Sequence, residues 1–456
     1  MKVHRNRSVR RAEVSVDGRN LISHAGTALL SELADRTGLT RAMSTAMGDC
    51  GISWHTHDPG VVLTHLAVAI ADGADCLSDL AALRENQELF GPVASIPTAW
   101  RALQATSSQE LRAIPRAVAA AREKVWAAAP PGPSLTLDFD ATLLTSHSDK
   151  QDAAPTYKKG FGFHPLGVWC DTTAEPLAAM LRPGNAGSND ADDHLELLDQ
   201  AIASLPLEYQ AGHEPGDLAG DVVHPILVRV DSAGATHDFA RGLVEANCEF
   251  SIGFPVNAQV RGGLMLVQEE DWVPAIELDG SRRAGAWVTE LTGLLDLSSW
   301  PEGTRLLCRR ERPHPGAQLS LFDIGEGFRH TCCITNTAGT EVASLELRHR
   351  GHARVEDRVR NWKSCGLGNL PFEDVVRNMA WVQVSLVAGC LLAWAQMVCF
   401  GGALAKAEPK TLRYRILHVA ALLVRRGRRL MLRLDQTWPW ADDLALAFRR
   451  VRTAFG

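Results

Sequence analysis

The first quarter of the chain has apolar residues at a spacing of three to four. This spacing places apolar side chains along one face of a helix, and it runs through residues 21–43, 61–83 and 108–129. Within the first stretch, Ala34 and Gly38 followed by Leu39 and Thr40 have the spacing of a helix-turn-helix, and Ser95 precedes Pro97 as an N-cap would. The pattern predicts a mostly helical block that either contacts DNA or is an ordinary set of helical hairpins.

A Pro/Gly-rich linker at residues 128–134 ends the helical pattern, and strand-like patterns follow. The segments are listed here in chain order: strands at 134–145, 163–171 and 175–184, a helix at 190–205, a strand at 224–231, a helix at 236–247 and a strand at 248–256. This order predicts a mixed α/β sheet.

Short β-type runs with intervening turns occupy residues 256–340, and the pattern then returns to helix at 344–366. Residues 379–405 form a run of 27 residues without a formal charge, long enough to span a bilayer. Gln383, Ser385 and Gln396 interrupt the run, and no other segment matches its length. We therefore expect a helix buried against the core, with no membrane as partner.

Charge is distributed unevenly along the chain. The total of 47 Lys and Arg against 53 Asp and Glu gives −6, but residues 401–456 carry 12 basic and 4 acidic side chains, a net +8 that leaves −14 elsewhere. Basic residues also gather at 2–11. Basic ends on an acidic body favour an anionic polymer as partner, with solvated helix faces as the alternative.

The cysteines and the N-terminal sequence indicate the cellular compartment of the protein. The ten cysteines contain no CxxC pair, which argues against a disulfide framework and against a structural zinc site. The basic N-terminus lacks the apolar core of a signal peptide, so we expect a cytoplasmic protein with reduced thiols.

Carboxylates at unusual places carry the chemical signal. Asp138 and Asp140 lie within an apolar strand, Asp231 ends another, and Glu356 lies on a helix among arginines. A buried carboxylate costs several kcal/mol (about 3–5) unless it is paired or binds a cation. Three such groups can converge on two Mg²⁺ ions, which activate water and stabilise the leaving oxygen of a phosphodiester.

Each carboxylate also has a purely structural explanation. Asp138 or Asp140 can pair with an arginine, Asp231 can cap the turn that follows it, and Glu356 can belong to a salt bridge. Serine-nucleophile chemistry is disfavoured because the chain has no GxSxG.

The order LDFDAT, ILVRVDSAG and HARVEDRVRNWK resembles the DDE-type transposases of bacterial insertion sequences, transposase DDE domain group 1. The resemblance extends over about residues 95–400, including LRPGNAGSN and GLGNLPF. It implies an RNase H-like catalytic domain with a β-rich insertion. It also assigns Asp140, Asp231 and Glu356 as the catalytic and metal-binding residues, with Mg²⁺ as cofactor and Mn²⁺ as a substitute.

The family's helix signature places a tyrosine, an arginine, a glutamate and a lysine in order. Lys363 fits the lysine position, whereas His349 and His352 occupy the positions of the tyrosine and the arginine. The resemblance implies that Lys363, with Arg354, Arg358 or Arg350 as substitutes for the missing arginine, contacts DNA. Where related enzymes hold a flipped base, the candidates here are Trp272, Trp287 and Trp300, although core packing is the other explanation.

The expected layout has five parts. These are a helical DNA-binding domain at 1–130, the first part of the catalytic core at 131–255, the β-rich insertion at 256–340, the last part of the core at 341–400, and a basic helical C-terminal region at 401–456.

By resemblance, the expected protein is a bacterial, nucleoid-associated transposase that binds terminal inverted repeats and target DNA as a homodimer in a synaptic complex. Two alternatives stay open, a catalytically inactive DNA-binding regulator and a two-metal nuclease that does not join strands.

Overall fold

The centre of the molecule is a nine-stranded mixed sheet. The computed structural model describes residues 15–16, 19–50, 56–313, 316, 319–427 and 429–456. The strands, in spatial order, are β10 (Val273–Ile276), β11 (Arg282–Glu290), β12 (Arg305–Glu311), β13 (Arg329–Thr335), β9 (Glu249–Phe254), β8 (Ile226–Val230), β2 (Leu135–Ala141), β6 (Leu166–Cys170) and β7 (Glu175–Met180). β8 pairs in parallel with β2 and β9, and the other pairs are antiparallel. The predicted mixed α/β sheet is confirmed.

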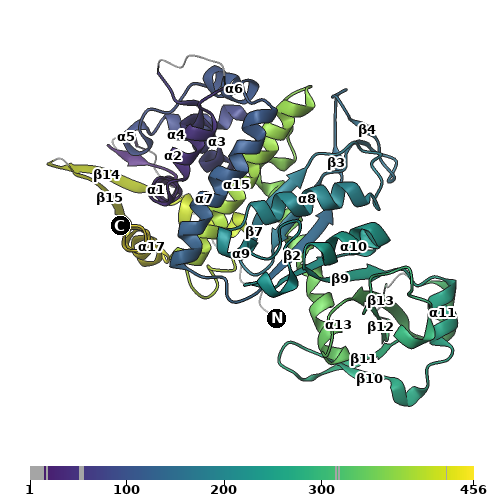
Figure 1. Cartoon of the computed structure of the whole chain (residues 1–456). Coiled ribbons are helices and arrows are strands. Elements are labelled where there is room, and N and C mark those ends of the chain that lie inside the picture. Colours follow the sequence, from purple (N-terminus) through teal and green to yellow (C-terminus); the bar gives the residue numbers. More distant parts are fainter. Residues whose placement is uncertain (1–14, 17–18, 51–55, 314–315, 317–318, 428) are drawn as a thin grey trace, which may run out of the picture.

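The β-type runs after residue 256 continue this sheet. β13 pairs with β9, so β10–β13 extend the central sheet at one edge (Figure 1). The short helices α11 (Ala258–Leu264) and α12 (Leu321–Glu326) lie in the same part of the chain. The predicted β content of this segment is therefore confirmed, and its strands share hydrogen bonds with the preceding α/β region.

Helices cover the sheet on both faces near β2. Because side chains alternate along a strand, Phe139 points away from its neighbours Asp138 and Asp140. Phe139 packs against His194 of α8 (Ala191–Ala203) and Phe239 of α10 (His237–Glu245). The opposite face, with the two aspartates, packs against α14 (Val355–Trp362), which follows α13 (Val342–Arg350).

The predicted N-terminal helical block is confirmed. Its helices are α1 (Ala28–Thr37), α2 (Leu39–Ala46), α3 (Pro59–Asp72), α4 (Ala81–Arg84), α5 (Gln87–Phe90), α6 (Ile96–Gln104) and α7 (Ser108–Ala128). Gly38 has φ 82° and produces the sharp break between α1 and α2, a left-handed conformation that favours glycine. Ser95 is the N-cap of α6, with Pro97 in its first turn.

The long apolar run forms α15 (Val375–Cys399), which contacts α1, α3, α7 and β7. By length and composition this helix could cross a membrane, but 78% of its apolar window is buried inside the protein. The predicted buried core helix is confirmed.

Glu175 joins these helices to the sheet from the first position of β7. Its fully buried carboxylate accepts hydrogen bonds from Arg122 (Nε, 2.7 Å) and Trp126 (Nε1, 2.6 Å) of α7, and from Trp394 (Nε1, 2.7 Å) of α15. A buried carboxylate is tolerated here because it has a charged partner and several donors.

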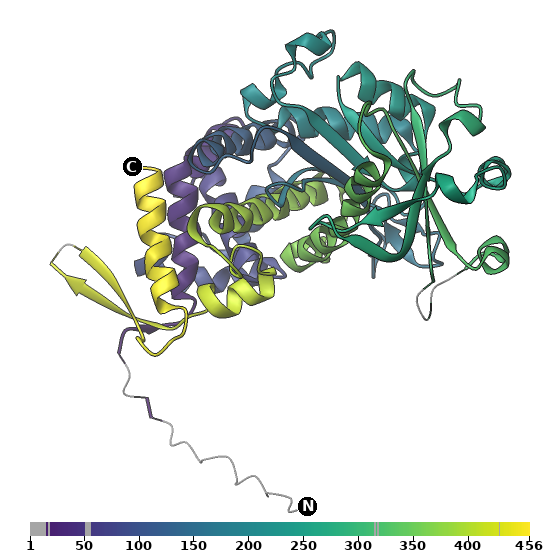
Figure 2. The ribbon, with the colours of Figure 1, turned by 90° about the horizontal axis from the view of Figure 1, so that it is seen from below.

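The C-terminal region differs from the prediction of a helical segment. Residues 421–434 form a hairpin of β14 (Ala421–Arg426) and β15 (Arg429–Leu434), followed by α17 (Ala441–Ala454). The prediction was wrong for the hairpin because arginines mask its alternation, whereas Gly427, at φ 63°, supplies a turn that favours antiparallel strands. β1 (Leu21–Ile22) pairs with β14, and the hairpin projects from the helical part beside α17 (Figures 1 and 2).

Candidate functional site

Two of the predicted carboxylates lie at matching ends of neighbouring strands. Asp140 is on β2, and Asp231 directly follows β8. The two strands are parallel, with Asp138 opposite Arg229, so continuing this register by two residues brings Asp231 level with Asp140. Asp231 also accepts a hydrogen bond from the amide of Ala233 at 2.9 Å, which orients its side chain at the start of the following turn.

Glu356 reaches this edge of the sheet from α14. Val355, Val359 and Trp362 are the buried residues of this helix, and Trp362 packs edge-on against Trp169 of β6 with ring centres 5.6 Å apart. Glu356 lies in the first turn and is exposed. The packing of α14 across the sheet therefore brings a third carboxylate towards Asp140.

The charges of the two other carboxylates affect the pKa of Asp140. Burial, with smaller contributions from the charges of Asp231 and Glu356, raises the pKa of Asp140 to about 6, while His352 opposes the shift. The carboxylate oxygens of the three residues do not all lie within 4.8 Å of one another, a spacing that only His24, Asp72 and His418 reach among the described residues. The site is an open group of acidic side chains, with His352 and Lys363 as basic groups that act on Asp140.

Asp138 has a different environment, although it is two residues from Asp140. It is fully buried, and both its oxygens accept hydrogen bonds from Arg229, each at 2.7 Å. His352 Nδ1 lies 3.0 Å from the same carboxylate. Asp138 is thus the aspartate that pairs with an arginine, and its oxygens are occupied within the protein.

Asp171, which directly follows β6, contacts three of the arginines near the predicted site. It accepts from Arg229 at 2.8 Å and from Arg354 Nε at 3.0 Å, and Arg358 Nη2 lies 3.7 Å from it. Burial alone would raise the pKa of Asp171, but the bonds from Arg354 and Arg229 hold it below its usual range. Arg358 Nε is buried without a hydrogen-bond partner in the part of the chain that the structure describes.

Lys363 lies at the rim of the carboxylate group. Its ammonium donates to the carbonyl oxygen of Leu143, just beyond β2, at 3.2 Å. Burial lowers the pKa of Lys363, while Asp140 raises it and Lys158 lowers it further. Lys363 is therefore close enough to Asp140 for their charges to interact, and Lys158 lies near Lys363.

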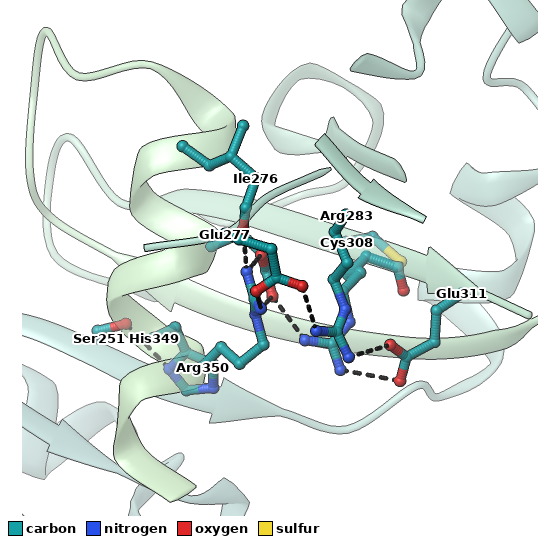
Figure 3. Close-up of polar contacts among 10 residues, drawn as sticks. Ser251, Ile276, Glu277, Arg283, Cys308, Glu311, His349 and Arg350 are labelled. Atoms are coloured by element: carbon teal, nitrogen blue, oxygen red, sulfur yellow. Dashed lines mark hydrogen bonds and ion pairs between the residues drawn. The ribbon is translucent and has the colours of Figure 1, made fainter. Parts of the chain in front are cut away.

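Arg350 is engaged elsewhere (Figure 3). Its guanidinium bonds to Glu277 at 3.0 Å, to the carbonyl oxygen of Ile276 and to Glu346 of its own helix. These contacts join α13 to the loop after β10. Its role as a DNA contact stays a prediction, and its described partners favour a structural role.

The two histidines in the family's helix signature are both internal. His349 lies 3.0 Å from the hydroxyl of Ser251 (Figure 3), and burial lowers its pKa to about 3, so the ring is neutral. His352 is paired with Asp138. The phosphate-binding charge of the family's arginine is therefore not supplied by either ring in this structure.

Two of the three candidate tryptophans surround a single guanidinium. Arg310 lies 4.3 Å from the ring centre of Trp272 and 5.4 Å from that of Trp287, with Phe328 at 5.0 Å. Trp300 instead packs edge-on against His237 and Phe254. All three tryptophans are half-buried and have packing partners within the protein.

Sequence reasoning missed Asp171 and Arg229. The signal for Asp171 was available, since it follows an apolar strand directly, as Asp231 does. Arg229 stands in the middle of an apolar run, where a charged side chain requires a buried partner.

A family model agrees with the resemblance found in the sequence. The family model "Transposase DDE domain group 1" matches residues 3–455. A cryo-EM structure of the piggyBac transposase synaptic complex with hairpin DNA is similar over 89% of this chain and 82% of that chain, with 10% sequence identity and a TM-score of 0.40. No curated protein matches the chain.

Proposed function

Since the chain belongs to the DDE transposase family of group 1, we propose that it binds the terminal inverted repeats of a bacterial insertion sequence and catalyses Mg²⁺-dependent DNA cleavage and strand transfer. The observation that carries this proposal is the convergence of Asp140, Asp231 and Glu356 at one edge of the sheet. Their electrostatic coupling, seen in the raised pKa of Asp140, supports it.

The donor set fits the cation that the family implies. Asp140, Asp231 and Glu356 offer only carboxylate oxygens, the ligands that Mg²⁺ prefers, and Mn²⁺ accepts the same donors. Bound there, the cations would supply activation of water and stabilisation of the leaving oxygen. The three residues would hold them, and the net negative charge of the group would favour their binding.

The neighbouring residues position this group and the DNA. The Asp138–Arg229 pair locks β2 and β8 in register, so that Asp140 and Asp231 stay level. Lys363 lies where it can bind a phosphate next to the carboxylates, and Arg354 and Arg358 can exchange Asp171 for a phosphate. Arg350 contributes least, because its partners lie on β10 and α13.

We assign the catalytic core to two sequence segments. β2, β6–β9 and helices α8, α10 and α14 supply an RNase H-like core over residues 131–255 and 341–400, and β10–β13 are the β-rich insertion at 256–340. Residues 1–130 and 401–456 form the DNA-binding parts. The protein acts in the cytoplasm on the nucleoid, as a homodimer that holds two DNA ends in a synaptic complex.

The projecting hairpin is the strongest candidate for a DNA-binding surface in the C-terminal part. Arg426, Arg429 and Arg433 are exposed and have no acidic partner among the described residues, and Arg426 lies directly opposite Arg429. Like charges in opposite positions destabilise a hairpin by roughly 0.2–1 kcal/mol. A phosphate backbone would relieve this repulsion, and two-stranded ribbons fit the major groove.

The test is cleavage of a labelled DNA fragment that carries the end of the element encoding this chain, with Mg²⁺. Asp140→Asn, Asp231→Asn and Glu356→Gln should each bind the fragment but fail to cut it. Asp357→Asn is the matched control, because Asp357 is an exposed acid on the same turn of α14. It should cut normally.

The other outcomes separate the alternatives. Binding without any cleavage by the natural protein would identify a catalytically inactive regulator. Cleavage without joining of the 3′ ends to a target would identify a two-metal nuclease. Normal cutting by any of the three variants would remove that residue from the proposed site.

A further inference from the structure

Two histidines and an aspartate from distant parts of the sequence lie together at the base of the β14–β15 hairpin. His24 precedes the turn that leads into α1, Asp72 ends α3, and His418 lies three residues before β14. His24 Nδ1 is 2.5 Å from Asp72 Oδ2, and His418 Nε2 is 3.3 Å from Asp72 Oδ1. One ligand atom from each residue lies within 4.8 Å of the others.

The carboxylate of Asp72 is buried and oriented. It is 5% exposed, and the hydroxyl of Thr27 donates to Oδ1 at 2.5 Å. A bond of this kind orients a ligating carboxylate from outside the ligand set.

The two imidazoles converge from the solvent side. Their ring centres are 4.1 Å apart with a tilt of 39°, and their side chains are 33% and 37% exposed. A dissolved ion can therefore reach the group. His24 also holds a left-handed backbone conformation, φ 57°, which is uncommon for a residue other than glycine and is often retained at functional sites.

The spacing of the donors is close to that of a tetrahedral site. Ligand bonds of about 2.0–2.1 Å to a tetrahedral ion place donor atoms about 3.3 Å apart. The carboxylate of Asp72 presents a different oxygen to each imidazole, and His418 Nε2 already has this separation from Oδ1. The separation of His24 Nδ1 from Asp72 Oδ2 would have to lengthen by less than about 1 Å, and His418 would release the carbonyl oxygen of Asp72, now 2.7 Å away.

We propose that His24, Asp72 and His418 bind one divalent transition-metal ion of the zinc type, with water as the fourth ligand. Two imidazoles and one carboxylate suit Zn²⁺ or Co²⁺, whereas Mg²⁺ prefers oxygen donors alone. The ion is thus different from the cation expected at Asp140. It ties residues 21–27, the end of α3 and the base of the hairpin together, and it does not depend on the proposed catalytic function.

The site escaped sequence analysis because its ligands have no motif spacing. Asp72 is 48 residues from His24 and 346 from His418. Cysteine spacing bears on thiolate zinc sites alone, whereas here the fold brings two distant histidines to one aspartate.

The experiment measures Co²⁺ and Zn²⁺ binding by the untagged, full-length chain in which Asp140→Asn, Asp231→Asn and Glu356→Gln remove the other proposed metal site. Co²⁺ is followed by its visible absorption, and Zn²⁺ by equilibrium dialysis. We expect one ion per chain, with the absorption of a tetrahedral site. Adding His24→Gln and His418→Gln should weaken binding at least ~100-fold, and Zn²⁺ should no longer raise Tm.

The matched control is His147→Gln with His237→Gln, since both are exposed histidines distant in sequence from the cluster. It should bind the metal normally. His418→Gln alone, at a partly exposed position, is the second variant if the double change prevents folding. Equal metal binding by the natural and the altered clusters, or no stoichiometric binding by either, would overturn the proposal and leave a hydrogen-bonded His–Asp–His cluster.

Discussion

Asp138 and Arg229 lie opposite each other on parallel neighbouring strands and are joined by two hydrogen bonds of 2.7 Å. Both side chains are buried, so the pair is shielded from solvent. Two residues further along, the same strands present Asp140 and Asp231, which have no arginine partner among the described residues. On the same face, the strand pair therefore holds Asp138, whose charge Arg229 balances, and the two aspartates Asp140 and Asp231, whose charges no arginine balances.

Removing the charge of Asp138 should destabilise the protein. Asp138→Asn leaves the buried guanidinium of Arg229 with only Asp171 as a charged partner, and breaking a buried pair costs about 3 kcal/mol or more. A lower Tm in thermal unfolding would show this. Asp149→Asn, at an exposed position nearby in sequence, is the control and should leave Tm unchanged. An unaltered Tm for Asp138→Asn would contradict the assigned role.

Removing the charge of Asp140 should have the opposite effect on stability. Its folded pKa, about 6, exceeds the value of about 3.9 in an unfolded chain. The folded state thus binds the proton more tightly, and the free energy of unfolding decreases as pH rises from about 4 to 6.

Without divalent cations, Asp140→Asn should therefore stabilise the protein at pH 7.5, by up to about 3 kcal/mol. The gain should shrink as pH falls through 6 and vanish below about 4. Thermal unfolding of both proteins across this pH range, in a chelating buffer, measures the difference. A gain that does not vary with pH would show that ionisation of Asp140 is not its source.

Glu175 should be among the most sensitive positions in the core. Glu175→Gln leaves the buried Arg122 without its charged partner, and we expect a loss of about 3–5 kcal/mol in the free energy of unfolding. Denaturant unfolding followed by tryptophan fluorescence reports directly on this region, because Trp126 and Trp394 donate to Glu175. Glu208→Gln, which changes an exposed glutamate, should behave like the natural protein.

The hairpin arginines should control affinity for DNA without altering cleavage chemistry. Replacing Arg426, Arg429 and Arg433 by Gln should weaken DNA binding and reduce the slope of log K against log salt by roughly 2 to 3, since each phosphate contact contributes about 0.9. Filter binding from 50 to 300 mM salt gives the slope. The same charge removed at Arg282, Arg312 and Arg329, which lie outside the proposed DNA-binding parts and are exposed and unpaired among the described residues, should change the slope less. Equal changes in the two triple variants would assign the effect to total charge.

Much of the fold followed from periodicity. The order of the longer strands and helices from residue 134 to 256 was predicted correctly because each alternates or repeats clearly and is separated by Gly- or Pro-containing turns, whereas the short strands β4 (Ala154–Pro155) and β5 (Phe161–Phe163) were not predicted. The hairpin at 421–434 was not predicted, because its strands combine continuous apolar residues with arginine pairs. β14 also pairs with β1, which lies near the other end of the chain.

The site was predictable as a set of residue types but not as a set of contacts. The sequence singled out Asp138 as well as Asp140, and only the strand register shows that Arg229 faces the first of them. The sequence does not distinguish Arg350, Arg354 and Arg358 from one another as candidate DNA contacts. Their partners, Glu277 for Arg350 and Asp171 for Arg354 and Arg358, come from strands and loops that sequence spacing does not relate.

The helical layer is assembled from both ends of the chain. α15 packs against α1, α3 and α7, α17 packs against α1, and Arg452 pairs with Glu32. During synthesis on the ribosome, α1–α7 therefore emerge more than 200 residues before the helices that cover their apolar faces. Until the last helix is released, those faces have only chaperones or one another as partners, and a transcript truncated before residue 375 would encode a chain that cannot complete this layer.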